Sequence, residues 1–402
     1  MQEVKYIILG AGPSGLAFSH ALMKAGENDF VILEKETEVG GLCRSMFVDG
    51  TPLDIGGGHF LDVKNKVALN ILFQYMNQNE WQKYNRKSKI RFRGIEIDYP
   101  IESNIWQLRV DDQLDIIESI AKAGNVCGEA MPKFFDKWIN WKLGTIIAEE
   151  YMLPYNRKIF SIDLNELGTY WLKKLPSVGF RDTIYSCIVK KSTGEVPAHE
   201  NFYYPKDYGY GEVWKRIGKA LKSKLITNTP VSRIDIENRI VNRNFKADTI
   251  INTIPWTVWP KIADIPENIR IEIKKLRYSS IDVDYHKDAI DTDAHWIYIP
   301  DEQIRHHRVL CRFNFINNSR GYWTETNSIR DIGKSLFKHR NEFAYPLNTI
   351  DKPAAITKII DWAENKQIIG IGRWGKWEHM NSDVAVAEAM KKADELTGRT
   401  YG

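Results

Sequence analysis

A glycine-rich turn between an apolar strand and a helix constrains this chain more than any other feature. Residues 6–9 form a short apolar run that predicts a buried strand, and residues 16–24 predict a helix. Between them, residues 10–15 read Gly-Ala-Gly-Pro-Ser-Gly. A second buried strand is predicted over residues 30–33, with Glu34 directly after it. This order of strand, turn, helix, strand and acid is typical of a dinucleotide-binding βαβ unit.

Each part of this unit has a physical role. Gly10 permits the tight turn out of the strand, Gly12 lets the backbone approach a pyrophosphate, and Gly15 lets helix and strand pack closely. The helix N-terminus offers free N–H groups and a partial positive charge to the phosphates. Glu34 stands at the usual interval for binding a ribose hydroxyl pair. The competing interpretation, glycines used only for tight packing, does not account for the acid.

The bulk properties bound the class of protein. The chain has 402 residues. A single hydrophobic core rarely supports a chain of that length, so we expect two or three domains. Hydrophobic residues make up 43% of it, which argues against disorder. The 56 basic and 52 acidic residues nearly balance without a long basic block, so nucleic acid is not an expected partner. No apolar run approaches the ~18 residues that span a bilayer.

The cysteines and the N-terminus favour a cytoplasmic location. No Cys-x-x-Cys pair is present, so we expect neither a disulfide framework nor a metal site, and a reducing cytoplasm suits the thiols. The chain enters an apolar strand at once, without the charged region and cleavage site of a signal peptide. The four widely spaced cysteines are Cys43, Cys127, Cys187 and Cys311.

Further strands and helices are predicted downstream. A hairpin is expected over residues 90–92 and 95–99, around the turn Arg93-Gly94. Strand-like runs return at residues 234–236, 250–254, 296–299, 309–315 and 367–371, and a last helix is predicted over about residues 382–392. This pattern indicates one nucleotide-binding domain built from discontinuous pieces, with two insertions. The apolar stripes that predict helices are Val67, Ile71, Tyr75 beside Ala68, Leu72, Met76; then Leu114, Ile117, Ala121; then Phe134, Trp138, Trp141.

A second glycine motif follows the first. Residues 39–45 read Val-Gly-Gly-Leu-Cys-Arg-Ser and resemble the second motif of FAD-dependent amine oxidases and their relatives. The adjacent glycines let the backbone run beside the cofactor, and Arg44 can hold its phosphate or ring edge. Residues 247–255 and 370–373 look like the late strand motif and the closing cofactor segment of the same superfamily. Together these pieces predict non-covalently bound FAD.

Other segments resemble UDP-galactopyranose mutase over most of the chain. The matching segments are residues 54–60, 99–104, 144–160, 203–214, 345–346 and 372–375. The resemblance implies an α/β protein with a Rossmann-type FAD-binding domain built from discontinuous segments, an inserted helical domain and an antiparallel sheet domain. The expected division is residues 1–84, 201–275 and 350–402 for the FAD-binding domain, 103–200 for the helical domain, and 85–102 and 276–349 for the sheet domain.

The resemblance also implies an unusual use of the flavin. In that family, N5 of the reduced flavin attacks the anomeric carbon of the sugar and displaces the nucleoside diphosphate. The sugar ring of this adduct opens and recloses at a different size, so pyranose and furanose forms interconvert without net redox change. NAD(P)H or another donor first reduces the flavin. We therefore expect a mutase, an isomerase whose partner is a small nucleotide sugar, serving the biosynthesis of a surface polysaccharide.

The resemblance assigns roles to individual residues. His59, Arg308 and Tyr345 are the expected catalytic residues, with His59 on the flavin side and the other two at the diphosphate. The expected substrate contacts are Tyr155, Asn156, Phe160, Lys174, Arg308 and Tyr345. The expected cofactor contacts are Gly10, Gly12, Gly15, Glu34, Gly40, Gly41, Arg44, Gly57, Gly58, His59, Val231, Gly372 and Arg373.

Three positions depart from the family's pattern. Phe160 replaces the tryptophan that stacks under uracil in many members, and His379 replaces a second tyrosine. The family's second diphosphate arginine has no clear match: Leu175 stands nearby, and Lys173 and Lys174 beside it keep the charge but lack the bidentate fork. The sugar, the base, the reductant and the oligomeric state, monomer or homo-oligomer, stay open.

Two other functions also stay open, because a fold does not fix a function. One is an FAD-dependent oxidoreductase of the amine oxidase or protoporphyrinogen oxidase type. The other is a catalytically silent FAD-binding subunit that acts by protein interaction. The candidate site residues also have non-catalytic interpretations. Arg308 could lie on a solvated strand face, and Tyr345 and Phe160 could be core residues. His306 and His307 could be structural or surface residues.

Overall fold

Strand β1 lies at the centre of a mostly parallel sheet. The computed structural model describes residues 1–172, 178–194, 200–316, 319–330, 333 and 335–398. The strand order of this first sheet is β10-β2-β1-β13-β12-β11, with β19 also paired to β13. Only β11 and β12 run antiparallel to their neighbours. The strands are β1 (Gln2–Leu9), β2 (Phe30–Leu33), β10 (Leu225–Ile226), β11 (Ile234–Asp235), β12 (Ile240–Val241), β13 (Phe245–Asn252) and β19 (Ile368–Gly370).

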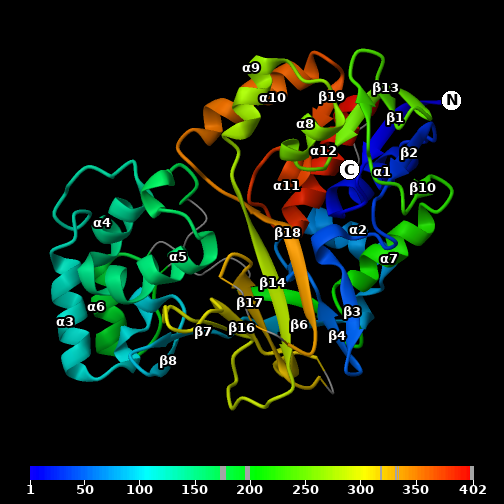
Figure 1. The fold of residues 1–402 in the computed structure, drawn as a ribbon. Helices are drawn as coiled ribbons and strands as arrows, with labels where there is room; N and C mark the ends of the chain where they lie inside the picture. Colours follow the sequence, from blue (N-terminus) through cyan, green and yellow to red (C-terminus); the bar gives the residue numbers. More distant parts are fainter. Residues whose placement is uncertain (173–177, 195–199, 317–318, 331–332, 334, 399–402) are drawn as a thin grey trace.

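Helices cover both faces of this sheet. Successive side chains of a strand point to opposite faces, so Ile8 enters one hydrophobic core while Ile7 and Leu9 enter another. The first core includes α1 (Pro13–Lys24), α2 (Lys66–Tyr75), α7 (Gly211–Ala220) and α12 (Ser382–Thr397). The second includes α8 (Trp259–Ile262), α9 (Glu267–Lys274) and α10 (Lys352–Glu364). This confirms the predicted Rossmann-type architecture, assembled from segments distant in the sequence (Figure 1).

A second seven-stranded sheet runs below the first in Figure 1, in the order β18-β14-β17-β16-β15-β7-β8. It was predicted to be antiparallel, and all its pairs are antiparallel except β7 with β15. The predicted hairpin is present, with Phe92 opposite Ile95 and with positive φ angles at Arg93 and Gly94. The strands are β7 (Ser88–Phe92), β8 (Ile95–Asp98), β14 (Tyr278–His286), β15 (Trp296–Tyr298), β16 (Arg308–Leu310), β17 (Tyr322–Asn327) and β18 (Lys338–Pro346).

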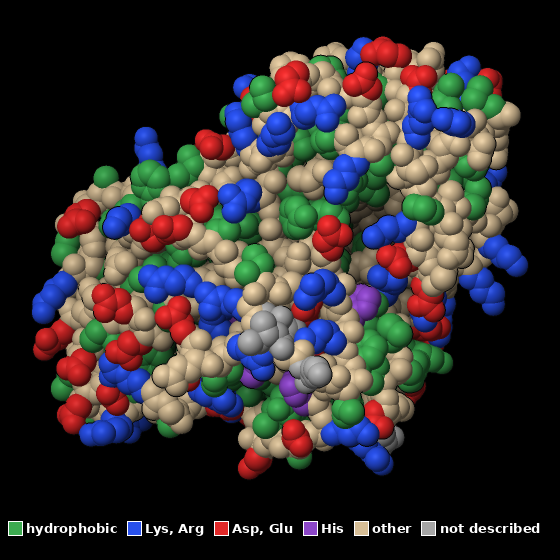
Figure 2. Space-filling view, viewed as in Figure 1, with side chains coloured by type: hydrophobic (Ala, Val, Ile, Leu, Met, Phe, Trp, Pro, Cys, Tyr) green, Lys and Arg blue, Asp and Glu red, His purple; other side chains and the backbone are tan. Residues whose placement is uncertain are grey.

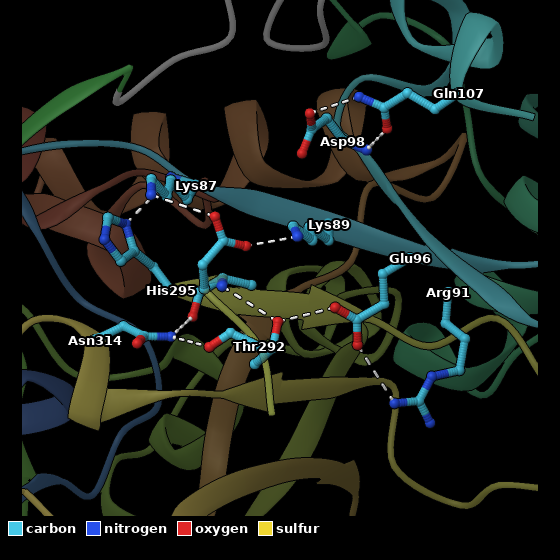
Figure 3. A network of polar contacts seen from close by, with 11 residues as sticks. Lys87, Lys89, Arg91, Glu96, Asp98, Gln107, Thr292, His295 and Asn314 are labelled. Carbon is cyan, nitrogen blue, oxygen red and sulfur yellow. Dashed lines mark hydrogen bonds and ion pairs between the residues drawn. The ribbon is translucent and has the colours of Figure 1, made fainter. Parts of the chain in front are cut away.

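Polar contacts tie the segment before β15 to the β7–β8 hairpin (Figure 3). The carboxylate of Asp293 lies 2.5 Å from Lys89 Nζ, and the Thr292 hydroxyl donates to Glu96 at 2.9 Å. The side-chain amide of Asn314 donates to the carbonyl oxygens of Thr292 and Ala294. Such half-exposed ion pairs add little stability individually. Together they fix the junction where the one parallel pair of this sheet forms.

A helical segment lies to one side of both sheets (Figure 1). Its helices share one hydrophobic core with the β7–β8 hairpin. Helix α4 is interrupted at Gly144, whose φ of 72° is non-helical, and a methyl group there would lie 2.6 Å from the carbonyl oxygen of Ser119. The helix therefore breaks where it touches α3. The helices are α3 (Val110–Ala121), α4 (Phe135–Ile147), the π-helical turn η5 (Ala148–Met152), α5 (Leu153–Phe160) and α6 (Phe180–Val189).

Several predicted details were wrong. Leu114 and Phe134 are exposed, and α3 buries Ile116 and Ile120 instead. The packing of the neighbouring helices, rather than the local apolar stripe, selects the buried face. The strand expected over residues 309–315 ends at Leu310 and gives way to the 3₁₀ turn η9 (Arg312–Asn314). Helix α1 begins at Pro13, inside the glycine motif, because proline is favourable in a first helical turn.

Short strands and turns complete the structure. One small sheet joins β3 (Ser45–Val48) to β4 (Thr51–Asp54), and another has the order β5-β9-β6. The remaining elements include β5 (Leu61–Asp62), β6 (Trp81–Asn85), β9 (Asn201–Pro205), the 3₁₀ turn η1 (Gly41–Cys43) and α11 (Gly372–Gly375). Among the described residues, no helix is both long and apolar enough to cross a membrane. The division into domains by residue number stays a prediction.

Candidate functional site

The glycines of the first turn have separate tasks. Gly10 has a φ of +100°, and a methyl group on Gly15 would lie 2.1 Å from the Gly10 carbonyl oxygen. Both residues are therefore required by the backbone itself. A methyl group on Gly12 would meet nothing closer than the Gly41 Cα at 3.9 Å. Gly12, the N-cap of α1, thus leaves open space at the helix N-terminus, where an anion is favoured.

Two more glycine segments meet this turn. A methyl group on Gly41 would lie 3.2 Å from the Gly12 Cα, and one on Gly372 would lie 2.0 Å from Ser14 Oγ. Both residues have positive φ angles, at 53° and 70°. Arg44 donates to the Gly41 carbonyl oxygen and forms an ion pair with Glu36. Three segments far apart in the sequence therefore make one narrow backbone cradle around the start of α1.

Glu34 is fixed at the edge of this cradle. It follows β2 directly and is buried. One carboxylate oxygen accepts from the Ala11 backbone N–H at 2.7 Å and the other from the Glu36 N–H at 2.9 Å. The acid predicted to bind a ribose is thus held against the glycine turn. Val231, in contrast, is half-buried and packs against the core on the α8–α10 face of the sheet.

The Gly57-Gly58-His59 loop faces a group of charged side chains. Its Gly58 N–H donates to Glu325 Oε1 at 2.9 Å. His59 Nε2 is buried and has no hydrogen-bond partner among the described residues. Burial, followed by the nearby positive charge of Arg373, lowers the pKa of His59 to about 3. The imidazole is therefore neutral at pH 7 and keeps one nitrogen free for a ligand.

Arg308 and Tyr345 meet beside this loop. Arg308 Nε donates to Glu325 Oε2 at 2.7 Å, its Nη2 also contacts that oxygen, and Nη2 lies 3.3 Å from the Tyr345 hydroxyl. Burial alone would raise the pKa of Glu325, but Arg308 and His307 lower it to about 2. The carboxylate is therefore ionised. Arg308 is not a solvated surface residue: only 18% of its side chain is exposed.

Arg373 adds a half-buried positive charge nearby. Its guanidinium donates to the carbonyl oxygens of Ala344 and Met380, and it forms no ion pair within the described part of the chain. Burial lowers its pKa. The ring of His379 lies 5.1 Å from that of Tyr345 in an edge-to-face contact. A half-buried cation that donates to carbonyl oxygens suits an anionic or electron-rich ligand.

The expected substrate residues of α5 are only partly brought to this group. The Tyr155 ring packs edge-to-face on Tyr298 and His307, and burial, reinforced by Tyr298, raises the pKa of its hydroxyl. The Asn156 amide donates to the Met152 carbonyl oxygen one helical turn back. Phe160 packs against the helical core. Lys173, Lys174 and Leu175 lie outside the described residues.

Sequence reasoning missed three buried charged residues at this site. Glu325 joins the histidine loop to Arg308, Arg312 pairs with Asp54 at 3.1 Å, and Lys158 is fully buried. A signal for the first was present: Glu325 stands two residues from the buried Trp323 on a strand, and so shares its face. His307 is also buried, rather than on the surface, with Nε2 3.6 Å from Glu325.

Comparisons with known proteins agree with this architecture. The model of a family described as an NAD(P)-binding Rossmann-like domain matches residues 8–76. An uncharacterized protein encoded in the nifH2 3′ region of Methanothermococcus thermolithotrophicus is 49% identical over 53 residues, 13% of this chain and 50% of that protein. The chain thus matches about half the length of this curated relative.

Solved structures extend the likeness to the whole chain. A crystal structure of reduced UDP-galactopyranose mutase superposes with a TM-score of 0.90 at 20% identity, covering 99% of this chain and 94% of that one. A protein from Exiguobacterium sp. 255-15, provisionally assigned as a protoporphyrinogen oxidase, gives a TM-score of 0.71 at 12% identity, with 99% of each chain covered. Cyclohexylamine oxidase from Brevibacterium oxydans gives 0.67 at 15% identity, again with 99% of each covered. The chain therefore has the fold of UDP-galactopyranose mutase, as its motifs predicted.

Proposed function

We propose that this protein binds FAD non-covalently and is a mutase that interconverts the pyranose and furanose forms of a nucleotide-activated sugar. The observation that carries the proposal is the meeting of Arg308, Tyr345 and the His59 loop beside the glycine cradle, in the fold of UDP-galactopyranose mutase. The proposal includes NAD(P)H as external reductant and a cytoplasmic location, where free thiols such as those of the four described cysteines persist.

The residues present fit FAD. The open space at Gly12 suits a pyrophosphate at the helix N-terminus, and Glu34 suits a ribose. His59 Nε2, which has no partner among the described residues, and the half-buried Arg373 suit the polar edge of a flavin. When bound and reduced, FAD supplies a nucleophilic ring nitrogen and an electron store, so the chain itself needs no nucleophile.

The protein's own groups then bind, orient and exclude water. Arg308 and the Tyr345 hydroxyl, which lie 3.3 Å apart, would hold the oxygens of a diphosphate, and Glu325 fixes the orientation of Arg308. The buried ring of Tyr155, packed edge-to-face on the half-buried Tyr298, would limit the access of water from this side. On the face shown in Figure 2, Lys and Arg side chains surround a hollow between the helical segment and the parallel-sheet part, which favours an anionic ligand.

One observation favours the second candidate, an FAD-dependent oxidoreductase. Two nitrogens of Arg308 already contact Glu325, so this ion pair carries no net charge toward a diphosphate. The sequence also has no clear match for the family's second diphosphate arginine, with Leu175 standing nearby. An oxidase that acts on a less charged substrate would need neither an unpaired charge on Arg308 nor a second arginine.

The decisive experiment counts products per reducing equivalent. The protein is reconstituted with FAD, reduced without oxygen, and incubated with nucleotide sugars that differ in base and in sugar. Many isomerised molecules per reducing equivalent, none from oxidised protein, and loss of activity in Arg308→Met support the mutase. One electron pair per product, or turnover that starts from oxidised flavin, supports the oxidoreductase. Failure to bind any FAD after reconstitution contradicts both.

A further inference from the structure

The peptide group between Gly57 and Gly58 lies between two fully buried side chains of opposite charge. Its N–H donates to Glu325 Oε1 at 2.9 Å, and its carbonyl oxygen lies 3.5 Å from Arg312 Nη2. The positive end of the peptide dipole thus faces the carboxylate, and the negative end faces the guanidinium. A flipped peptide would reverse both contacts, so the two charges favour a single orientation.

The position of Arg312 is fixed by Asp54 and by two aromatic rings. Its Nη2 pairs with Asp54 Oδ2 at 3.1 Å, and Asp54 is fully buried at the end of β4. Asp54 also accepts hydrogen bonds from the Tyr204 hydroxyl at 2.8 Å and from the Tyr210 backbone N–H at 2.9 Å. The Arg312 guanidinium lies over the rings of Tyr204 and Phe315. Arg312, which lies in the turn η9, therefore has little freedom to move relative to the loop.

The burial of Arg312 is energetically unfavourable. Its Nε and Nη1 are buried, and neither has a hydrogen-bond partner among the described residues. Unsatisfied buried donors destabilise a protein, and replacing a buried ion pair by apolar residues is often neutral or stabilising. Packing alone does not explain Arg312. Besides Asp54, the Arg312 guanidinium contacts the Gly57 carbonyl oxygen.

We propose that Arg312 is a positioning residue which, together with Glu325, sets the orientation of the Gly57–Gly58 peptide against the flavin and thereby the flavin's reduction potential. This inference rests on the proposed FAD binding, and it holds whether the enzyme is a mutase or an oxidoreductase. The same Glu325 binds Arg308, so the peptide orientation and the substrate-side arginine depend on one carboxylate.

The test measures the two-electron midpoint potential of the FAD-loaded protein and its Arg312→Met and Arg312→Lys variants. Reduction adds negative charge near the loop, so Arg312→Met is expected to shift the equilibrium toward oxidised flavin by at least tenfold, about 30 mV. Lysine keeps the charge but lacks the planar guanidinium that lies over the rings of Tyr204 and Phe315, so its ammonium group is not held in the same position. Arg312→Lys is therefore expected to shift it by at least threefold, about 15 mV. A crystal structure of either variant should show a changed Gly57–Gly58 peptide.

Matched controls separate the possible causes. Tyr204→Phe removes one hydrogen bond to Asp54 without touching the peptide, and it should lower thermal stability but not the potential. An equal shift in Tyr204→Phe would mean general loosening and would overturn the inference, as would a shift in Arg312→Met alone, or an unchanged peptide in both variants. If the Arg312 variants do not fold, Glu325→Gln takes their place, and an unchanged potential there refutes the inference. Wild-type protein that binds no FAD refutes the proposed function instead.

Discussion

Arg308 and Glu325 face each other directly across the neighbouring strands β16 and β17. They are register partners, and Arg308 Nε donates to Glu325 Oε2 at 2.7 Å. The carboxylate is fully buried, whereas 18% of the arginine side chain is exposed. The exposed part of the Arg308 side chain is therefore available to a ligand, while its Nε is held by Glu325. An incoming anion has to share this guanidinium with the protein's own carboxylate.

This pair predicts unequal effects of single and double substitution. Arg308→Met leaves Glu325 buried without its main cation, so we expect a loss of about 3 kcal/mol in the free energy of unfolding. The double variant Arg308→Met/Glu325→Gln should recover most of that stability, because neither charge then remains buried alone. Neither variant should bind a nucleoside diphosphate well, and both should keep the FAD spectrum. Urea denaturation and calorimetric titration measure these quantities. Tight diphosphate binding by the stable double variant would contradict the assigned role of Arg308.

The glycines of the first turn predict two distinct kinds of failure. Gly12→Val should fold with nearly wild-type stability yet bind no FAD, because the added side chain enters open space at the helix N-terminus. Gly15→Ala should instead unfold more easily, since its methyl group would lie 2.1 Å from the Gly10 carbonyl oxygen. Thermal melts of the apoproteins, followed by flavin absorbance after reconstitution, distinguish the two. FAD retained at full occupancy by Gly12→Val would place the cofactor elsewhere.

Lys158 predicts a pH dependence of stability. Its Nζ is fully buried and donates to the carbonyl oxygens of Ile299 and Asp301, both at 2.7 Å. Burial lowers its pKa from 10.5 to about 7, opposed by Asp301 and assisted by Arg330. A neutral amine has two N–H groups for these two acceptors, whereas an ammonium group has a third that would need a partner.

The sign follows from proton uptake. Between pH 7 and 10.5 the unfolded chain keeps a proton on Lys158 that the folded chain has lost. The contribution of this group to stability therefore rises with pH across that window, by at least about 1 kcal/mol. Lys158→Met should remove this rise, and the difference between the two denaturation series isolates it from other titrating groups. Parallel pH profiles would show that Lys158 stays charged in the folded protein.

The short-range part of the fold could be predicted from the sequence. The βαβ unit, its glycine turn and the Arg93-Gly94 hairpin follow from sterics within a few residues. Gly10, for example, has a φ of 100° that a residue with a side chain rarely adopts. The apolar period predicted that α3 exists, but it did not predict that α3 buries Ile116 rather than Leu114. That choice depends on which helix packs against it.

The tertiary structure alone decided which charges meet. Gly58 and Glu325 are 267 residues apart, and Asp54 at the end of β4 pairs with Arg312 from the turn η9. Alternation along a strand predicts which face a side chain takes, but it does not name the partner opposite. Buried ion pairs exist only where packing removes water from both members, and that condition depends on segments distant in the sequence. The sequence by itself therefore determined the βαβ unit and its glycine turn, through local backbone geometry, whereas the approach of Gly41 and Gly372 to that turn came from the tertiary structure. The charged network beside it was decided by long-range packing.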